Sequence, residues 1–266
     1  MKAQDLPKRA QPIAAVLRTG LSVLFSAVLI TAAPLSLADD DDDEIPFAVA
    51  NIFFELNHTD GDLGIHALID GEPWKELGIE GPYERELLSI RVKSRLRRQG
   101  LTEIFFESAE PSFDELRPRR FFRRFPEGEY EVEGETLEGD ELESVAMVTH
   151  LMPAPPEPTV NGIPAAEDCD AALPVVSDPV IIEWVPVTES HPEIGRTGEP
   201  IEVVNYEVVV EIDETPFRSS TILPPDVMSF RVPSEILALS DEVKFEVLVR
   251  EASGNQTAVE SCFELM

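Results

Sequence analysis

The sequence has few cysteines, few basic residues and few histidines. It holds 2 cysteines and 4 histidines in 266 residues, and 52 Asp and Glu outnumber 21 Lys and Arg. The net charge of −31 argues against binding nucleic acid or an anionic membrane over most of the surface. It favours solubility and cationic or divalent partners.

The chain also lacks the short motifs that mark common enzyme classes. It contains no G-x-S-x-G, no phosphate-binding loop and no H-E-x-x-H. None of the histidines has metal-ligand spacing with another His or a Cys, and His66 alternates with apolar residues, which indicates packing. Acidic pairs are too common here to indicate glycosidase chemistry. We therefore expect a non-catalytic protein.

Long apolar runs are scarce, and the one at residues 21–35 follows a basic start and ends at Ser36-Leu37-Ala38. This layout is typical of a signal peptide, residues 1–38, cleaved after Ala38. The run is shorter than the about 20 apolar residues that span a bilayer and it contains Pro34. A retained anchor is the alternative. The sequence thus predicts a secreted or periplasmic protein without a membrane span after cleavage.

The predicted mature chain opens on a block of acidic residues, Asp39 to Glu44. We interpret residues 39–45 as a solvated, disordered tail, because contiguous acids lack the spacing of a coordination loop. Loose binding of Ca²⁺ is the alternative. The remaining length suits two domains.

Residues 46–152 predict a mainly β domain with one short helix, and we assign it to no known family. The expected strands are residues 46–56, 64–70, 73–79, 86–93, 101–107, 129–133 and 141–150. Asp70-Gly71 predicts a hairpin turn. Ser112 and Glu115 predict a capping box for helical turns within residues 111–125, which Pro118 interrupts.

Proline is concentrated between the two predicted domains. Residues 153–164 are too rich in proline for a central strand. They predict a semi-rigid linker that runs into the first edge strand of the second domain.

Residues 165–266 predict an all-β sandwich. Phe245, Val247 and Val249 alternate with Lys244 and Glu246, which is the period of a half-buried strand. Similar short strands are expected at residues 180–187, 203–212, 217–223, 227–232 and in the last segment.

Specific residues make this half resemble a fibronectin type III domain. Trp184 matches the core Trp of the second strand, and Tyr206 matches the Tyr of the third. Leu239, Val243 and Phe245 fall on the Leu-x-Pro-x-Thr-x-Tyr corner, and the turn before the last strand holds Gly254 and Asn255.

The resemblance covers roughly residues 155–266 and has departures. Phe245 replaces the corner Tyr, Asp241 the Pro and Val243 the Thr, and the loop at residues 188–200 is long. The resemblance implies a seven-stranded recognition or spacer module without catalysis. Another immunoglobulin-like sandwich with the same strand pattern is the alternative.

A weak metal site is suggested near the first predicted turn. Asn57, Asp60 and Asp62, with Asp70 nearby, place oxygen ligands on a glycine-containing loop that suits Ca²⁺. The segment lacks the full twelve-residue loop and its closing Glu, so we favour a plain turn. We expect no cofactor, with Ca²⁺ as the possible exception.

Basic residues are concentrated in one stretch of this acidic chain. They are Arg91, Lys93, Arg95, Arg97, Arg98, Arg117, Arg119, Arg120, Arg123 and Arg124. We favour pairing with the protein's own carboxylates and a solvated face. The alternative is an anion-binding or partner-binding patch formed by Arg119, Arg120, Arg123 and Arg124, which would bind an acidic partner or a lipid headgroup.

The two cysteines, Cys169 and Cys262, allow one intramolecular pairing. An exported chain reaches an oxidising compartment, where disulfides persist. We predict that the bridge clamps the last strand of the sandwich. Two separate buried thiols are the alternative.

These features together predict an exported, non-catalytic protein that acts in recognition or surface assembly, with the second domain as a docking face or spacer. We expect its partner to be a protein or carbohydrate at the cell surface. A Ca²⁺-dependent carbohydrate-binding or hydrolase accessory module is the second hypothesis, and an enzyme of unknown reaction is the third.

Overall fold

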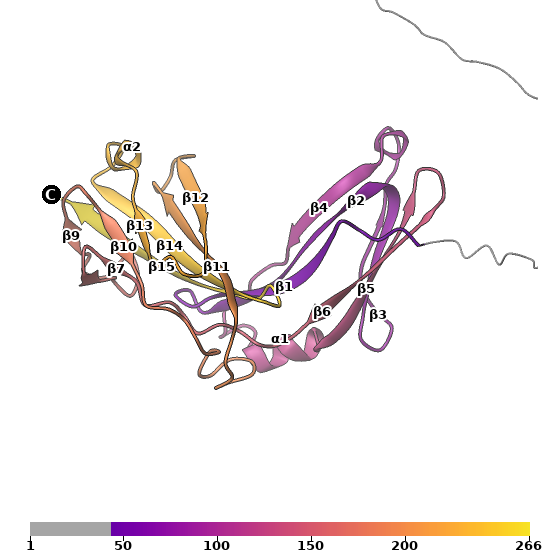
Figure 1. Ribbon diagram of the computed structural model, residues 1–266, viewed down its shortest axis with the longest axis horizontal. Helices are drawn as coiled ribbons and strands as arrows, with labels where there is room; N and C mark the ends of the chain where they lie inside the picture. Colours follow the sequence, from indigo (N-terminus) through magenta and orange to yellow (C-terminus); the bar gives the residue numbers. More distant parts are fainter. Residues whose placement is uncertain (1–43) are drawn as a thin grey trace, which may run out of the picture. The chain divides into compact units, whose positions relative to one another are not determined.

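The computed structural model describes residues 44–266 and confirms the all-β class (Figure 1). The predicted signal peptide and the acidic tail up to Asp43 lie outside the described residues. The predicted tail ends earlier than expected, because Ile45 already bridges to Leu142 and donates its backbone N–H to the carbonyl of Glu141.

The first half of the described chain contains six strands, one α-helix and a turn of 3-10 helix. They are β1 (Val49–Asn57), β2 (Asp62–Gly81), β3 (Arg85–Arg91), η1 (Leu96–Arg98), β4 (Leu101–Glu107), α1 (Pro118–Arg124), β5 (Gly128–Thr136) and β6 (Glu141–Val148). The prediction of a mainly β half with one short helix is confirmed.

The second half contains nine strands and a short helix. They are β7 (Thr159–Val160), β8 (Ile163–Pro164), β9 (Val175–Val176), β10 (Ile181–Glu183), β11 (Val203–Glu211), β12 (Arg218–Leu223), β13 (Ser229–Arg231), α2 (Ser234–Leu237), β14 (Glu242–Glu251) and β15 (Gln256–Leu265).

The hairpin predicted at Asp70-Gly71 is wrong, because the chain continues there as the single 20-residue strand β2. Before Asp70 the strand pairs with β1 and β4, and after a register shift at Trp74 it pairs with β3 and β5. A Cβ at Gly71 would lie 2.9 Å from the Phe47 ring. The glycine therefore allows the ring to pack against a strand that changes partners, and no reversal of the chain is needed.

Helix α1 also begins later than the capping box predicted. The carbonyl of Ser112 accepts hydrogen bonds from the N–H groups of Glu115 and Leu116, which closes an isolated turn. The helix starts at Pro118, which occupies the first helical turn, where a missing N–H costs nothing. The proline that was expected to interrupt the helix thus begins it.

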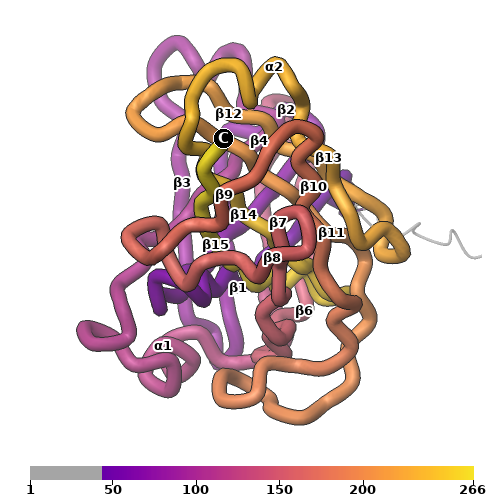
Figure 2. The backbone as a smooth tube through the Cα atoms, turned by 90° about the vertical axis from the view of Figure 1, so that its left-hand side faces the viewer, coloured from indigo at the N-terminus to yellow at the C-terminus, as the bar shows by residue number. Residues whose placement is uncertain are grey.

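The second half forms two packed sheets. Strands β13, β10, β7 and β8 make one sheet, which lies in front of β14 and β15 in Figure 2. A buried cluster that includes Trp184, Tyr206, Phe245 and Phe263 fills the space between the sheets. The predicted β-sandwich is therefore present, with Phe245, Val247 and Val249 facing its core as their alternation indicated.

A single sheet connects the two halves. Its strand order is β12-β11-β14-β15-β1-β2-β5-β6, so the last strand of the sandwich pairs with the first described strand. The pairing is parallel and aligns Glu55 with Gln256 and Asn57 with Ala258. The two halves keep separate buried clusters on this shared sheet.

The start of the predicted linker is fixed against this shared sheet. The carbonyl of Pro153 accepts a hydrogen bond from Thr257 Oγ1 at 2.8 Å, and the N–H of Ala154 donates to the carbonyl of Glu189 at 3.0 Å. Ile194, from the long loop at residues 188–200, is 8% exposed and joins the buried cluster of the first half. This loop therefore also packs across the boundary between the halves.

Candidate functional site

The predicted disulfide between Cys169 and Cys262 is confirmed. The two Cα atoms lie 5.0 Å apart, and Cys262 in β15 is 1% exposed. The bond holds the segment that precedes β10 against the last strand of the sandwich.

The side chain of Asn57, one of the predicted metal ligands, forms hydrogen bonds within the turn itself. Asn57 Oδ1 accepts hydrogen bonds from the N–H groups of Thr59 and Asp60, each at 3.1 Å. Asn57 Nδ2 donates to Asp60 Oδ2 at 3.2 Å. This is a side-chain-stabilised turn of the kind that Asn forms without a metal.

The other two predicted ligands lie apart from each other. Asp62 has a buried Oδ1 without a hydrogen-bond partner in the described residues, and burial followed by the charge of Glu110 raises its pKa to about 6. Asp70 lies further along the same strand, about 26 Å away at about 3.3 Å per residue. The structure does not bring Asp70 to the turn, and Ca²⁺ binding by the remaining three residues stays the untested alternative to the plain turn that we favoured.

A group of carboxylates gathers on the face of the shared sheet that is opposite the sandwich core. They line a cavity of about 270 Å³ that strands from both halves enclose, with Glu55, His66, Glu107, Glu207, Glu246 and Arg250 among its residues. Burial, then the charges of Glu55 and Glu260, raise the pKa of Glu246 to about 8. This cavity could not be predicted from the sequence, because its residues meet only through pairing between distant strands.

His66 is the basic residue at one end of this cavity. It is 3% exposed, its Nε2 lies 2.9 Å from Glu110 Oε1, and its Nδ1 lies 3.7 Å from Glu55 Oε2. Burial opposes the charged form, yet the hydrogen bond to Glu110 and the charge of Glu55 raise the pKa of His66 above its usual value.

His66, Glu107 and Glu110 could also hold a metal ion, because one ligand atom from each lies within 4.8 Å of the others. The hydrogen bond between His66 and Glu110 accounts for the contact of these two side chains without an ion.

A group of exposed arginines lies on and just before α1. We call Arg117, Arg119, Arg120, Arg123 and Arg124 the α1 arginine surface. Within residues 44–266 none of the five lies in an ion pair with a carboxylate, although other arginines and lysines of the chain do. Of the basic residues for which we favoured internal pairing and a solvated face, Arg91 pairs with Glu76 at 2.9 Å, whereas the five α1 arginines form a solvated face without ion pairs in the described part of the chain.

The helix that carries these arginines is fixed to the core. Phe121 and Phe122 are buried, and each ring centroid lies 5.5 Å from that of Phe54 in β1. Aromatic pairs at this spacing and tilt add to the free energy gained by burial. The arginines thus project from a rigid base.

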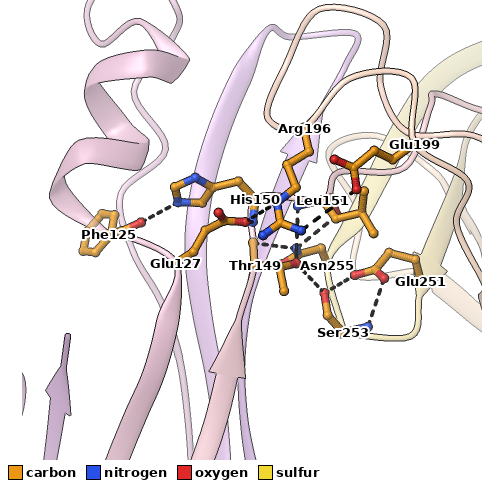
Figure 3. Close-up of polar contacts among 10 residues, drawn as sticks. All are labelled: Phe125, Glu127, Thr149, His150, Leu151, Arg196, Glu199, Glu251, Ser253 and Asn255. Carbon is orange, nitrogen blue, oxygen red and sulfur yellow. Dashed lines mark hydrogen bonds and ion pairs between the residues drawn. The ribbon is translucent and has the colours of Figure 1, made fainter.

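The same helix adjoins a polar network at the junction of the two halves (Figure 3). Glu127 accepts hydrogen bonds from the N–H of His150 at 2.7 Å and from Arg196 Nε at 2.8 Å. Partial burial opposes its ionisation, but these two bonds lower the pKa of Glu127 below its usual value. His150 Nε2 lies 2.8 Å from the carbonyl of Phe125 at the end of α1.

Asn255 is the buried centre of this junction network and is 1% exposed. Its Nδ2 donates to the carbonyls of Thr149 at 2.9 Å and Leu151 at 3.1 Å, and its Oδ1 accepts from the N–H of Phe54 at 2.8 Å. The sequence placed Asn255 in the turn before the last strand but gave no sign of this role. Its partners are far away in sequence.

No helix among residues 44–266 is long and apolar enough to cross a membrane. No family model and no curated protein matches the sequence.

Similar solved structures include fibronectin type III domains and a surface adhesin. The FN1–FN3 domains of chicken CNTN1 match at a TM-score of 0.32 and 12% identity, over 83% of this chain and 65% of that chain. The two-domain fibronectin type III segment of chicken tenascin matches at 0.27 and 10%, over 82% and 95%. A bacterial ice-binding adhesin matches at 0.24 and 11%, over 84% and 65%. Likenesses this weak assign neither a family nor a function.

Proposed function

We propose that this protein is an exported, non-catalytic recognition module that presents the α1 arginine surface to an anionic partner at the cell surface. The observation that carries the proposal is the set of five exposed arginines without ion pairs among residues 44–266 of a chain whose net charge is −31.

A guanidinium binds carboxylate, sulfate or phosphate groups through paired hydrogen bonds, and an acidic protein offers many carboxylates of its own. Five arginines that stay clear of those carboxylates are available to an outside anion. The acidic parts of the surface repel the same anion, so they direct it toward surfaces where unpaired arginines gather, of which α1 carries the largest group.

The packing and hydrogen bonds beneath the α1 arginine surface suit a docking or spacer role. The helix is pinned by two buried phenylalanines, and the junction network fixes the adjoining loop. Little conformational entropy is then lost at the surface when a partner binds. The disulfide suits an oxidising compartment, which supports export.

The test measures retention of the protein on an immobilised polyanion, dextran sulfate, as the salt concentration rises. We expect wild type to bind and to release as salt increases, because each arginine–anion contact is electrostatic. Replacing Arg119, Arg120, Arg123 and Arg124 together with glutamine should abolish retention.

The control is the variant in which Arg95, Arg97 and Arg98 become glutamine, since these exposed arginines beside η1 also lack ion pairs within the described residues. It should keep most of the retention. Equal losses in the two variants, with both folded by circular dichroism, would show that net charge and not the α1 surface controls binding.

A further inference from the structure

A hollow of about 440 Å³ lies between helix α1 and the loop at residues 193–196. Arg119 and Arg123 line it from the helix, where residues four apart share one face. Arg196 lines it from the loop, and Figure 3 shows His150 between the helix and Arg196. Three arginines from two separate segments therefore line the hollow.

The loop that lines one side of the hollow is held by a backbone hydrogen bond and a close backbone contact. Arg196 donates its backbone N–H to the carbonyl of His150 at 2.9 Å. Gly195 has φ of +74°, and a Cβ on it would lie 2.0 Å from that same carbonyl oxygen. Only glycine allows the loop to approach the segment after β6 so closely, and the hydrogen bond from Arg196 holds it there.

The charges in the hollow are unbalanced toward positive. Arg196 is bound to Glu127, but Arg119 and Arg123 have no carboxylate partner within residues 44–266. Glu193 is the one carboxylate among the lining residues in this part of the chain. Phe122 and Ile194, which also line the hollow, add apolar surface.

We propose that this hollow is a specific binding site for a single oxyanion group carried on an apolar body, with Arg119 and Arg123 as its principal ligands. The proposal rests on the proposed function and narrows it to two of the five α1 arginines. The oxyanion lies between the two helical guanidiniums and Arg196, and the apolar body lies against Phe122 and Ile194. Such a ligand contacts α1 and the loop at once, so its binding stabilises the folded protein.

The test uses small probes at constant ionic strength: benzoate, benzenesulfonate, phenyl phosphate and inorganic phosphate. We expect a saturable rise in the melting temperature and saturable heat in titration calorimetry with at least one aromatic probe. Inorganic phosphate should bind more weakly, because it lacks the apolar body. The probe that binds most tightly identifies the oxyanion as a carboxylate, a sulfonate or a phosphate.

Two matched variants locate the site. Replacing Arg119 and Arg123 with glutamine should weaken probe binding by about tenfold or more, as expected for lost hydrogen bonds between charged groups. Replacing Arg120 and Arg124 with glutamine should leave probe binding within about twofold of wild type, which is about 0.4 kcal/mol at about 1.4 kcal/mol per tenfold.

Equal weakening in both variants, or no saturable binding of any probe to wild type, would overturn the inference. Retention on dextran sulfate separates this failure from that of the proposed function. A wild type that is retained by the polyanion but binds no probe has a general arginine surface without the specific hollow, and a wild type that does neither refutes both.

Discussion

The side chain of Asn255 accepts a hydrogen bond from the backbone N–H of Phe54 at 2.8 Å, across 201 residues of sequence. Asn255 lies in the turn that leads into β15, and Phe54 lies in the neighbouring strand β1. One buried amide therefore reinforces the seam at which the two halves share a sheet. The stability of each half is expected to depend on this seam.

Replacing Asn255 with alanine should lower the free energy of unfolding by about 3 kcal/mol, because the N–H of Phe54 and the carbonyls of Thr149 and Leu151 lose a partner in a buried position. Chemical denaturation measures the change. Asn51→Ala, at an exposed position of β1, is the control and should stay within about 0.5 kcal/mol of wild type. Similar small changes in both variants would mean that the seam does not need Asn255.

Trp184→Ala should destabilise both halves in one transition. Trp184 is 5% exposed and its ring centroid lies 5.3 Å from that of Tyr206, so truncation should cost about 3–5 kcal/mol. The semi-rigid linker expected from the sequence would separate the two cores and let the first half keep its own unfolding transition. Because β15 pairs with β1, we now expect joint melting, with calorimetry as the measurement. A first half that melts separately at an unchanged temperature would contradict this.

Removing the disulfide through Cys169→Ala with Cys262→Ala should lower stability by roughly 4 kcal/mol in the chain-entropy model, because the bond closes a loop with a sequence separation of 93. Unfolding of the double variant in denaturant measures the loss. Thiol titration of denatured, unreduced wild type should find no free thiol. Two free thiols per chain would show that the bond does not form in the native compartment.

Acid should destabilise the protein through His191. Its Nδ1 accepts hydrogen bonds from the N–H groups of Glu193 and Ile194, each at 3.1 Å, so the neutral ring carries its proton on Nε2, which faces His58. Burial, then the charge of His58, lower the pKa of His191 to about 4. Protonation at Nδ1 would break both backbone bonds.

The sign of the effect follows from this lowered pKa. Above about pH 6.5 the ring is neutral in both states and its contribution is fully present. As the pH falls toward 4, the unfolded chain takes up a proton and the folded protein does not, so up to about 3 kcal/mol is lost. Stability curves of wild type and His191→Gln should therefore converge as the pH falls through this window. Parallel curves would rule out His191 as the source.

Glu246→Gln should stabilise the protein at alkaline pH. The carboxyl ionises near 4.5 in the unfolded chain, but its pKa in the folded protein is about 8. Between these values the unfolded state releases a proton that the folded state keeps, so stability falls as pH rises. The substitution should gain up to about 4 kcal/mol at pH 8 and nothing near pH 4. Exposed Glu242→Gln is the control, and an equal gain there would point to net charge instead.

The local features of this fold could be predicted from the sequence. The strand at Phe245, Val247 and Val249 could be predicted, because the alternation of apolar residues repeats with the period of a strand. The disulfide could be predicted as well, since two cysteines in an exported chain allow one pairing. The concentration of arginines around α1 was visible too, although their lack of carboxylate partners was not.

Features that depend on long-range pairing were decided by the tertiary structure alone. Asp70-Gly71 is a strong local turn signal, yet pairing of β2 on both sides keeps the chain extended there. The parallel pairing of β1 with β15, the buried amide of Asn255 and the carboxylate cavity around Glu246 join residues about 200 positions apart. No local pattern encodes which distant strand will become a neighbour, because that choice depends on how the two buried clusters pack against a common sheet.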